Sequence, residues 1–217
     1  MTRGPLISLL RRRLRHALLD TAGTTLVEFA IVLSLFLLLF LGLIDFGRMS
    51  FNWVMAQKAT QMAARIATVR PPVCGGLPEF HSRGTVPTGT TAPGYGTFCR
   101  TASWVCADPG TFSCPGASTN ATAQEIWDRV APLLPNTATV ANLQFTYDFD
   151  SQLGFLGGPY TPMVTVELQN MQFDFVSPLG GLAQLAGAGS SSLGSPISMP
   201  SFSASLPGED LAAGNDG

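Results

Sequence analysis

A single carboxylate lies inside the most apolar stretch of the chain. Residues 26–44 have the sequence LVEFAIVLSLFLLLFLGLI, in which Glu28 is the one charged residue. A carboxylate within a membrane span costs about 2.5–3.5 kcal/mol at the bilayer centre, less near the edge, and usually marks a function. One interpretation is an interfacial acid whose side chain extends to water. The other is a charge that pairs with a cation on the same helix or on a neighbouring helix.

Gly23 stands five positions before Glu28 and suggests a source for that cation. Cleavage of the peptide bond between Gly23 and Thr24 would give Thr24 a new α-ammonium group. On a helix, Thr24 and Glu28 lie on one face, about 6 Å apart along the axis. Because buried charges are tolerated when they are paired, such a helix would suit side-by-side assembly with other helices.

Familiar catalytic patterns do not occur in the sequence. It contains no GxGxxG, P-loop, GxSxG or HExxH string. A Ser-His-Asp arrangement could use only His81, for which we expect a position on a surface loop. Asp148 and Asp150 share a predicted strand face, for which solvation is a simpler interpretation than calcium binding. We therefore predict that the protein is not an enzyme and, because its larger part is acidic, that it binds no nucleic acid.

The apolar stretch is long enough to cross a bilayer, since a helix over residues 24–44 would be about 31 Å long. Residues 1–23 hold five arginines and one acid, whereas residues 24–217 hold 7 basic and 13 acidic residues. Positive flanks stay in the cytoplasm, so we expect a cytoplasmic N-terminus and a periplasmic C-terminal part. A cleaved signal peptide is disfavoured because the run exceeds 7–15 residues and LGLIDFGRM offers no Ala-x-Ala site.

The N-terminal residues resemble a known family. Glycine, four residues and glutamate before a long apolar run resemble the type IV prepilin processing site. Residues 23–69 as a whole resemble the TadE-like family, the pseudopilins or minor pilins of tight-adherence (Flp-type, type IVc) pili. The features that carry the resemblance are Gly23, Glu28-Phe29-Ala30, the apolar run, Ile44-Asp45-Phe46-Gly47-Arg48 and Ala63-Ala64-Arg65.

This resemblance implies cleavage after Gly23 by a prepilin peptidase and a role in assembling or priming a thin surface pilus. Thr24, Glu28 and Phe29 would then be the assembly residues at the mature N-terminus. Partners would be other pilin subunits (TadF-like or major Flp-type pilins) and the pilus assembly platform. The expected location is the bacterial inner membrane, with possible incorporation into an extracellular pilus. The alternative is an uncleaved single-pass anchor whose external part binds a surface or ligand.

Four cysteines, Cys74, Cys99, Cys106 and Cys114, follow the predicted span on its outer side, where disulfides persist. Their even number predicts two disulfides, and the sequence leaves all three pairings open. Zinc is the alternative, but there is no CxxC pair and His81 is the one histidine in this part of the chain. We therefore predict no metal and no cofactor.

Periodicity predicts an α+β fold. One long helix should run from Thr24 to about Val69, with an apolar face in its second half and an end at Pro71-Pro72. Asp45 and Arg48 on this helix could form an exposed ion pair of little worth. A short amphipathic helix is expected at 124–134, and strands at 140–149, 164–175 and 197–206. The second strand should bend near Asn170, where its apolar alternation changes phase, and Pro200 should confine the third to an edge.

These elements give the expected domain organisation. It comprises a basic leader (1–23), a long helix (24–70, membrane-spanning at about 26–44), a cysteine-containing Thr/Gly/Pro-rich loop region (71–123), an α+β head with antiparallel strands (124–206) and a flexible tail (207–217). Within the head, the Gly/Ser/Ala-rich residues 178–195 are expected to be flexible.

Overall fold

The computed structural model describes residues 21–185, 189 and 192–211. The described chain divides into two compact units. One contains the chain up to Arg48 together with Asp174–Pro196, and the other contains Met49–Phe173 together with Ile197–Gly217. Most of the predicted leader and the end of the predicted tail lie outside the described residues. The predicted fold class is confirmed, because a long apolar helix, a four-stranded antiparallel sheet and two disulfides are all present.

Helix α2, Thr21–Ala67, contributes to both units and contains the whole apolar stretch. Its 47 residues correspond to about 70 Å of helix. It is the one helix among the described residues that is long and apolar enough to cross a membrane, and its apolar window has no buried residue. It starts three residues earlier and ends two residues earlier than the sequence pattern predicts.

In the second unit, four antiparallel strands form a sheet in the order β1-β2-β3-β6. Alternate side chains of the central strands point to one face and are fully buried there, as period-two alternation requires. Leu143, Phe145 and Tyr147 on β2 are no more than 1% exposed. The strands are β1 (Phe112–Pro115), β2 (Leu143–Asp148), β3 (Met163–Leu168) and β6 (Phe202–Pro207).

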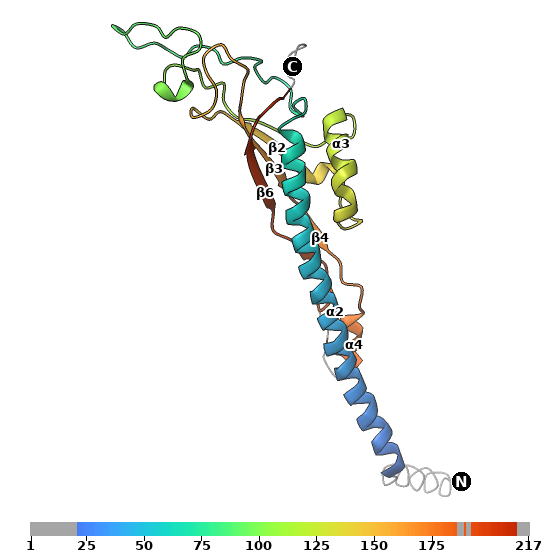
Figure 1. Ribbon diagram of the computed structural model, residues 1–217. Helices are drawn as coiled ribbons and strands as arrows, with labels where there is room; N and C mark the ends of the chain where they lie inside the picture. The colour runs from blue at the N-terminus through green and yellow to red at the C-terminus, as the bar shows by residue number, and fades with distance from the viewer. Residues whose placement is uncertain (1–20, 186–188, 190–191, 212–217) are drawn as a thin grey trace, which may run out of the picture. The chain divides into compact units, whose positions relative to one another are not determined.

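The C-terminal part of α2 runs beside the strands of the sheet in the same unit (Figure 1), and it buries a row of small side chains. Ala56, Ala59, Ala63 and Ala67 recur at spacings of three and four residues, so they lie on one face of the helix. Each is at most 1% exposed. Methyl side chains allow a close approach of the helix backbone to its neighbours, which explains why this face is rich in alanine.

Helix α3, Ala121–Val130, packs beside the end of α2 and continues into the 3-10 turn η2, Ala131–Leu133. Asn120 is its N-cap: the side-chain oxygen accepts a hydrogen bond from the Ala123 N–H at 2.9 Å. The Asn120 amide also donates to the Val73 carbonyl at 3.1 Å. Ile126 and Val130 on its apolar face are fully buried, which confirms the predicted amphipathic helix.

Two predicted strands are shorter than expected because the chain turns within them. Asn170 has a φ of 57°, and it separates β3 from β4, Gln172–Phe173. The predicted strand at 197–206 likewise divides into β5, Ile197–Ser198, and β6. The pair β4–β5 forms a separate two-stranded sheet, while β6 is an edge strand as predicted. The 3-10 turn η3, Val140–Asn142, occupies the start of the predicted strand at 140–149.

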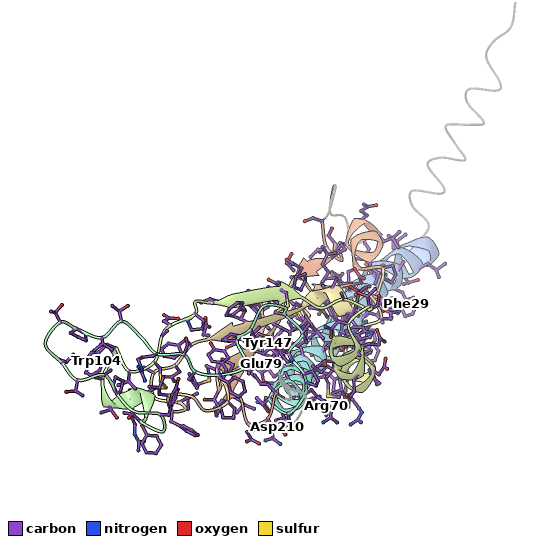
Figure 2. The ribbon with its side chains drawn as sticks, turned by 90° about the horizontal axis from the view of Figure 1, so that it is seen from above. Phe29, Arg70, Glu79, Trp104, Tyr147 and Asp210 are labelled. Carbon is purple, nitrogen blue, oxygen red and sulfur yellow. A yellow bond between two sulfur atoms is a disulfide. The ribbon has the colours of Figure 1, made fainter. Side chains whose placement is uncertain are left out.

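The loop region between α2 and α3 has its own small core. Val105, Leu156 and the two cysteines Cys99 and Cys106 are buried together. Trp104 packs against this cluster, and in Figure 2 it lies away from Tyr147 of the sheet. Three isolated antiparallel β-bridges hold this region together: Phe80 with Pro159, Arg83 with Cys106, and Phe98 with Phe155. The 3-10 turn η1 covers Cys99–Thr101.

In the first unit, the described residues between 174 and 196 accompany the apolar part of α2. Helix α4, Leu179–Leu185, lies beside that part of the helix (Figure 1). The sequence predicted a flexible segment over 178–195, so a helix at its start was missed. Pro178 immediately precedes α4 and favours a helix start because the N–H it lacks would have no intrahelical partner.

Candidate functional site

The predicted processing and assembly residues all lie in the first three turns of α2. The helix starts at Thr21, so Gly23 and Thr24 lie within its first turn. Glu28 and Phe29 follow on the next turn, and both side chains are exposed, Phe29 to 63%. An exposed carboxylate among exposed apolar side chains requires a compensating partner once the helix enters lipid or a bundle of helices.

A second acid, Asp45, lies one residue beyond the apolar run and is 1% exposed. Its carboxylate accepts hydrogen bonds from the backbone N–H groups of Val176, at 3.4 Å, and Ser177, at 3.1 Å. Arg48 donates to the same carboxylate at 2.9 Å. The predicted Asp45–Arg48 ion pair is therefore confirmed, but its expected exposure is wrong for Asp45, which is buried while the Arg48 side chain is 43% exposed. Its backbone partners come from a segment more than 130 residues away, which helical spacing does not reveal.

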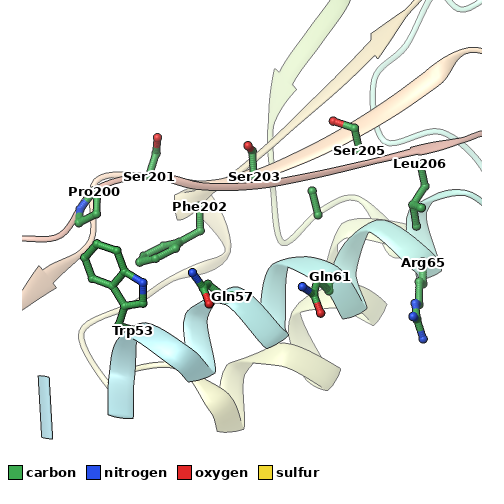
Figure 3. A pocket seen from close by; sticks show the side chains of 11 residues that line it. Trp53, Gln57, Gln61, Arg65, Pro200, Ser201, Phe202, Ser203, Ser205 and Leu206 are labelled. Carbon is green, nitrogen blue, oxygen red and sulfur yellow. The ribbon is translucent and has the colours of Figure 1, made fainter. Parts of the chain in front are cut away.

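A groove of about 680 Å³ runs between α2 and the edge strand β6. At one end, the Trp53 ring contacts Phe202 edge-to-face, with ring centroids 5.1 Å apart. Gln57 and Gln61 follow along the helix, and Arg65 lies at the other end (Figure 3). Trp53 thus contacts the sheet of the head.

The four cysteines form two disulfides, which confirms the predicted number and selects one of the three pairings. Cys74 pairs with Cys114, joining the segment after α2 to strand β1. Cys99 pairs with Cys106 inside the loop region, across seven residues of sequence. Because each of the four sulfurs is bonded to its partner in a disulfide, none is available as a thiolate ligand for a metal.

His81 is 2% exposed, so the predicted surface position is wrong. Its Nε2 accepts a hydrogen bond from the Thr161 N–H at 3.2 Å and lies 3.1 Å from the Thr161 hydroxyl. Gly154 packs so closely on the ring that a Cβ there would collide with Nε2, and its φ of 72° also favours glycine. Burial in this apolar setting lowers the pKa of His81 below its usual value.

Tyr160 packs beside His81, with ring centroids 5.2 Å apart. Its hydroxyl and the His81 Nδ1 are buried without a hydrogen-bond partner among the described residues. Burial, with the nearby charges of Asp108 and Asp148, raises the pKa of Tyr160 to about 12. Both side chains are therefore neutral at physiological pH. The His81 Nε2 already accepts a hydrogen bond from Thr161, so we interpret the cluster as part of the packed core of the loop region.

The segment that carries these N-terminal residues matches a known protein family. Residues 23–65 match the family model described as TadE-like protein. The N-terminal helix is thus similar to TadE-like proteins over these residues. The match includes Gly23, Thr24, Glu28, Phe29 and Asp45, and it ends before the first cysteine. Neither the curated proteins nor the solved structures gave a match to the chain.

Proposed function

We propose that the chain is a TadE-like minor pilin or pseudopilin that assembles or primes a tight-adherence pilus. The observation that carries the proposal is the family match over residues 23–65, which suggests a protein associated with Tad pili. The proposed location is the inner membrane, with α2 as the single span and the head on the periplasmic side. The arginine-rich residues before α2 support this orientation, since positive flanks stay in the cytoplasm.

Processing after Gly23 is part of the proposal. The Gly23–Thr24 bond lies in the first turn of α2, close to the start of the helix. Glycine is a weak helix former, so this turn is less stable than the apolar turns that follow. A prepilin peptidase at the cytoplasmic face could therefore reach this bond without unfolding the rest of α2.

Cleavage would convert the end of α2 into a matched pair of charges. Thr24 would carry an ammonium group one turn before the Glu28 carboxylate. The exposed faces of α2 around Glu28 and Phe29 offer apolar surface to a neighbouring helix. A subunit whose ammonium group pairs with the glutamate of its neighbour would stabilise a helical bundle, because both charges are then compensated in a medium of low dielectric.

The proposed role is structural rather than enzymatic. His81, the histidine considered for a Ser-His-Asp arrangement, is buried, and its Nε2 already accepts a hydrogen bond from the Thr161 backbone. That ring is therefore not placed to take a proton from a substrate. The proposed partners are a prepilin peptidase, other pilin subunits and the assembly platform.

Substitution of Glu28 tests the assembly role. Glu28→Gln keeps the side-chain size and removes the charge, so we expect normal membrane insertion and normal cleavage with a loss of assembled pili. Glu28→Asp is the matched control because it keeps the charge, and cells with this variant should still assemble some pili. Pili counted by electron microscopy at equal protein levels give the readout. Normal piliation by Glu28→Gln would contradict the charge-pairing proposal.

The groove between α2 and β6 favours one alternative, an uncleaved anchor whose head binds a ligand or surface. Its 680 Å³ and its mixture of aromatic, amide and cationic side chains are of the kind that binds a ligand. An uncleaved anchor would retain residues 1–23 in the mature protein. The substitution Gln57→Ala, which alters the groove without touching the span, would then abolish binding of that ligand but leave pili unchanged.

A further inference from the structure

Residues 175–208 contain no charged residue and no histidine, although charged residues make up 12% of the chain. Part of this stretch belongs to the compact unit of the apolar helix segment. Within that unit α4 lies beside the apolar part of α2 (Figure 1). A charge-free segment next to a membrane span is unusual for a part of the chain that faces water, because exposed loops normally carry charges.

The covered positions of α2 show how far this contact extends. Six residues in this part of α2 are less exposed than their neighbours. They recur at three- and four-residue spacing and therefore form one face of the helix: Ser34, Leu37, Leu38, Leu41, Gly42 and Asp45. Among the described residues, this unit otherwise contains only those between 174 and 196. Eleven residues separate Ser34 from Asp45, which corresponds to about 16 Å of helix. The segment therefore accompanies the half of the predicted span that is nearer the head.

The side chains of α4 divide into two groups. Leu179 and Ala183, four residues apart, are 6% and 4% exposed and form its packed face. Leu185, at the end of α4, is 73% exposed, and Val176, three residues before α4 begins, is 74% exposed. These values match that of Leu39 within the span, which is 74% exposed. The exposed apolar surface of α2 thus continues onto the segment beside it.

The start of this segment also meets the main requirement for entry into lipid, that backbone polar groups are satisfied within the protein. The N–H groups of Val176 and Ser177 donate to Asp45. Pro178 has no N–H, and that of Leu179 donates to the Ser177 carbonyl at 2.8 Å. Asp45 in turn is compensated by Arg48. No backbone donor from 176 to 179 is left without a partner.

We propose that residues 176–185 form a second membrane-contacting element, which Asp45 holds against the span and whose exposed apolar side chains insert among the lipid acyl chains of the leaflet next to the head. The proposal rests on the proposed single-pass anchor. Lipid is the occupant because the surface is uncharged, apolar except for the exposed Gln184, and continuous with the apolar surface of α2. Asp45 is a positioning residue, since it contacts the segment and not the lipid.

Labelling of single engineered cysteines in proteoliposomes tests the proposal. All four native cysteines are disulfide-bonded, so an added thiol can be labelled alone with an environment-sensitive fluorophore such as NBD under non-reducing conditions. Leu185→Cys carries the test, and Leu39→Cys is the matched control in the span. Thr91→Cys, in an exposed loop of the other unit, gives the aqueous reference. Each label is exposed to lipids with nitroxide on the acyl chain and, separately, to aqueous iodide.

We expect the label at 185 to lose fluorescence to the nitroxide lipids and resist iodide, as the label at 39 does. A label at 185 that iodide quenches, with 39 protected, would overturn the second element and leave the anchor intact. Labels at both positions quenched by iodide would instead overturn the anchor itself. Protection at 185 from both quenchers would indicate a protein partner and also overturn the proposal.

The role of Asp45 is tested in the same vesicles. Asp45→Ala should move the label at 185 from acyl-chain quenching toward iodide quenching while the label at 39 stays in lipid. Retention of acyl-chain quenching at 185 in this variant would overturn the positioning role of Asp45.

Discussion

The two disulfides differ in the length of chain they close, and this difference predicts unequal effects on stability. Cys74 and Cys114 are 40 residues apart, whereas Cys99 and Cys106 are 7 apart. A crosslink restricts the unfolded chain more when its loop is longer. The loop-closure relation gives about 3.9 kcal/mol for the long loop and about 2.4 kcal/mol for the short one at 25 °C.

The test compares two double serine variants of the full chain in detergent, one lacking the long-range disulfide and one lacking the short-range disulfide. Removing both cysteines of a pair avoids leaving a free thiol. For a chain of this size each 1 kcal/mol shifts the melting temperature by about 2–4 °C. We therefore expect losses of about 8–16 °C without Cys74–Cys114 and about 5–10 °C without Cys99–Cys106.

Circular dichroism during heating and urea unfolding gives both quantities. An equal loss in the two variants, or a larger loss without the short-range disulfide, would refute the reasoning from loop length. The larger expected effect also has a local cause, because Cys74 follows the end of α2 and its partner lies on strand β1. This disulfide thus links the long helix to the sheet.

Two further predictions concern buried polar groups of the head. The Tyr147 hydroxyl accepts a hydrogen bond from the Val73 N–H at 3.0 Å, so Tyr147→Phe should lower the free energy of unfolding by about 1–3 kcal/mol in urea titrations. Tyr160→Phe, which removes a hydroxyl without a partner among the described residues, should cost less, and an equal loss would contradict this account. Because burial lowers the pKa of His81, the unfolded chain binds a proton more readily below about pH 6.5. Stability should therefore fall from pH 7.5 to pH 5.5, and the fall should be smaller in His81→Gln; an unchanged slope would exclude His81 as its source.

Local periodicity predicted the elements whose pattern lies within one segment. The alternation through Leu143, Phe145 and Tyr147 predicted β2, and the change of phase near Asn170 predicted the point where β3 ends. The three- and four-residue spacing of apolar residues predicted an apolar face on the second half of α2, and its alanines are buried, whereas Phe46 and Val69 at its ends are exposed. Each of these signals reflects which side of a helix or strand is buried, so it is present in the local sequence.

Features that depend on distant partners could not be predicted in this way. Strand β1 has only four residues, and its register is set by pairing with β2. Asp45 is buried because residues 176–177 return to it, and His81 is buried because Thr161 and Gly154 close over its ring. Charged and polar residues are exposed on average, so the sequence alone predicts that Asp45 and His81 are exposed. Both are buried because of contacts with residues that are distant in the sequence.

The mature N-terminus tests the central claim most directly. The chain is extracted from its native membrane, in cells with an active prepilin peptidase, and its intact mass and N-terminal sequence are determined. The account predicts a chain that begins at Thr24, with the arginine-rich leader absent. A chain that keeps residues 1–23 would contradict the proposed pairing between a new N-terminal ammonium group and Glu28.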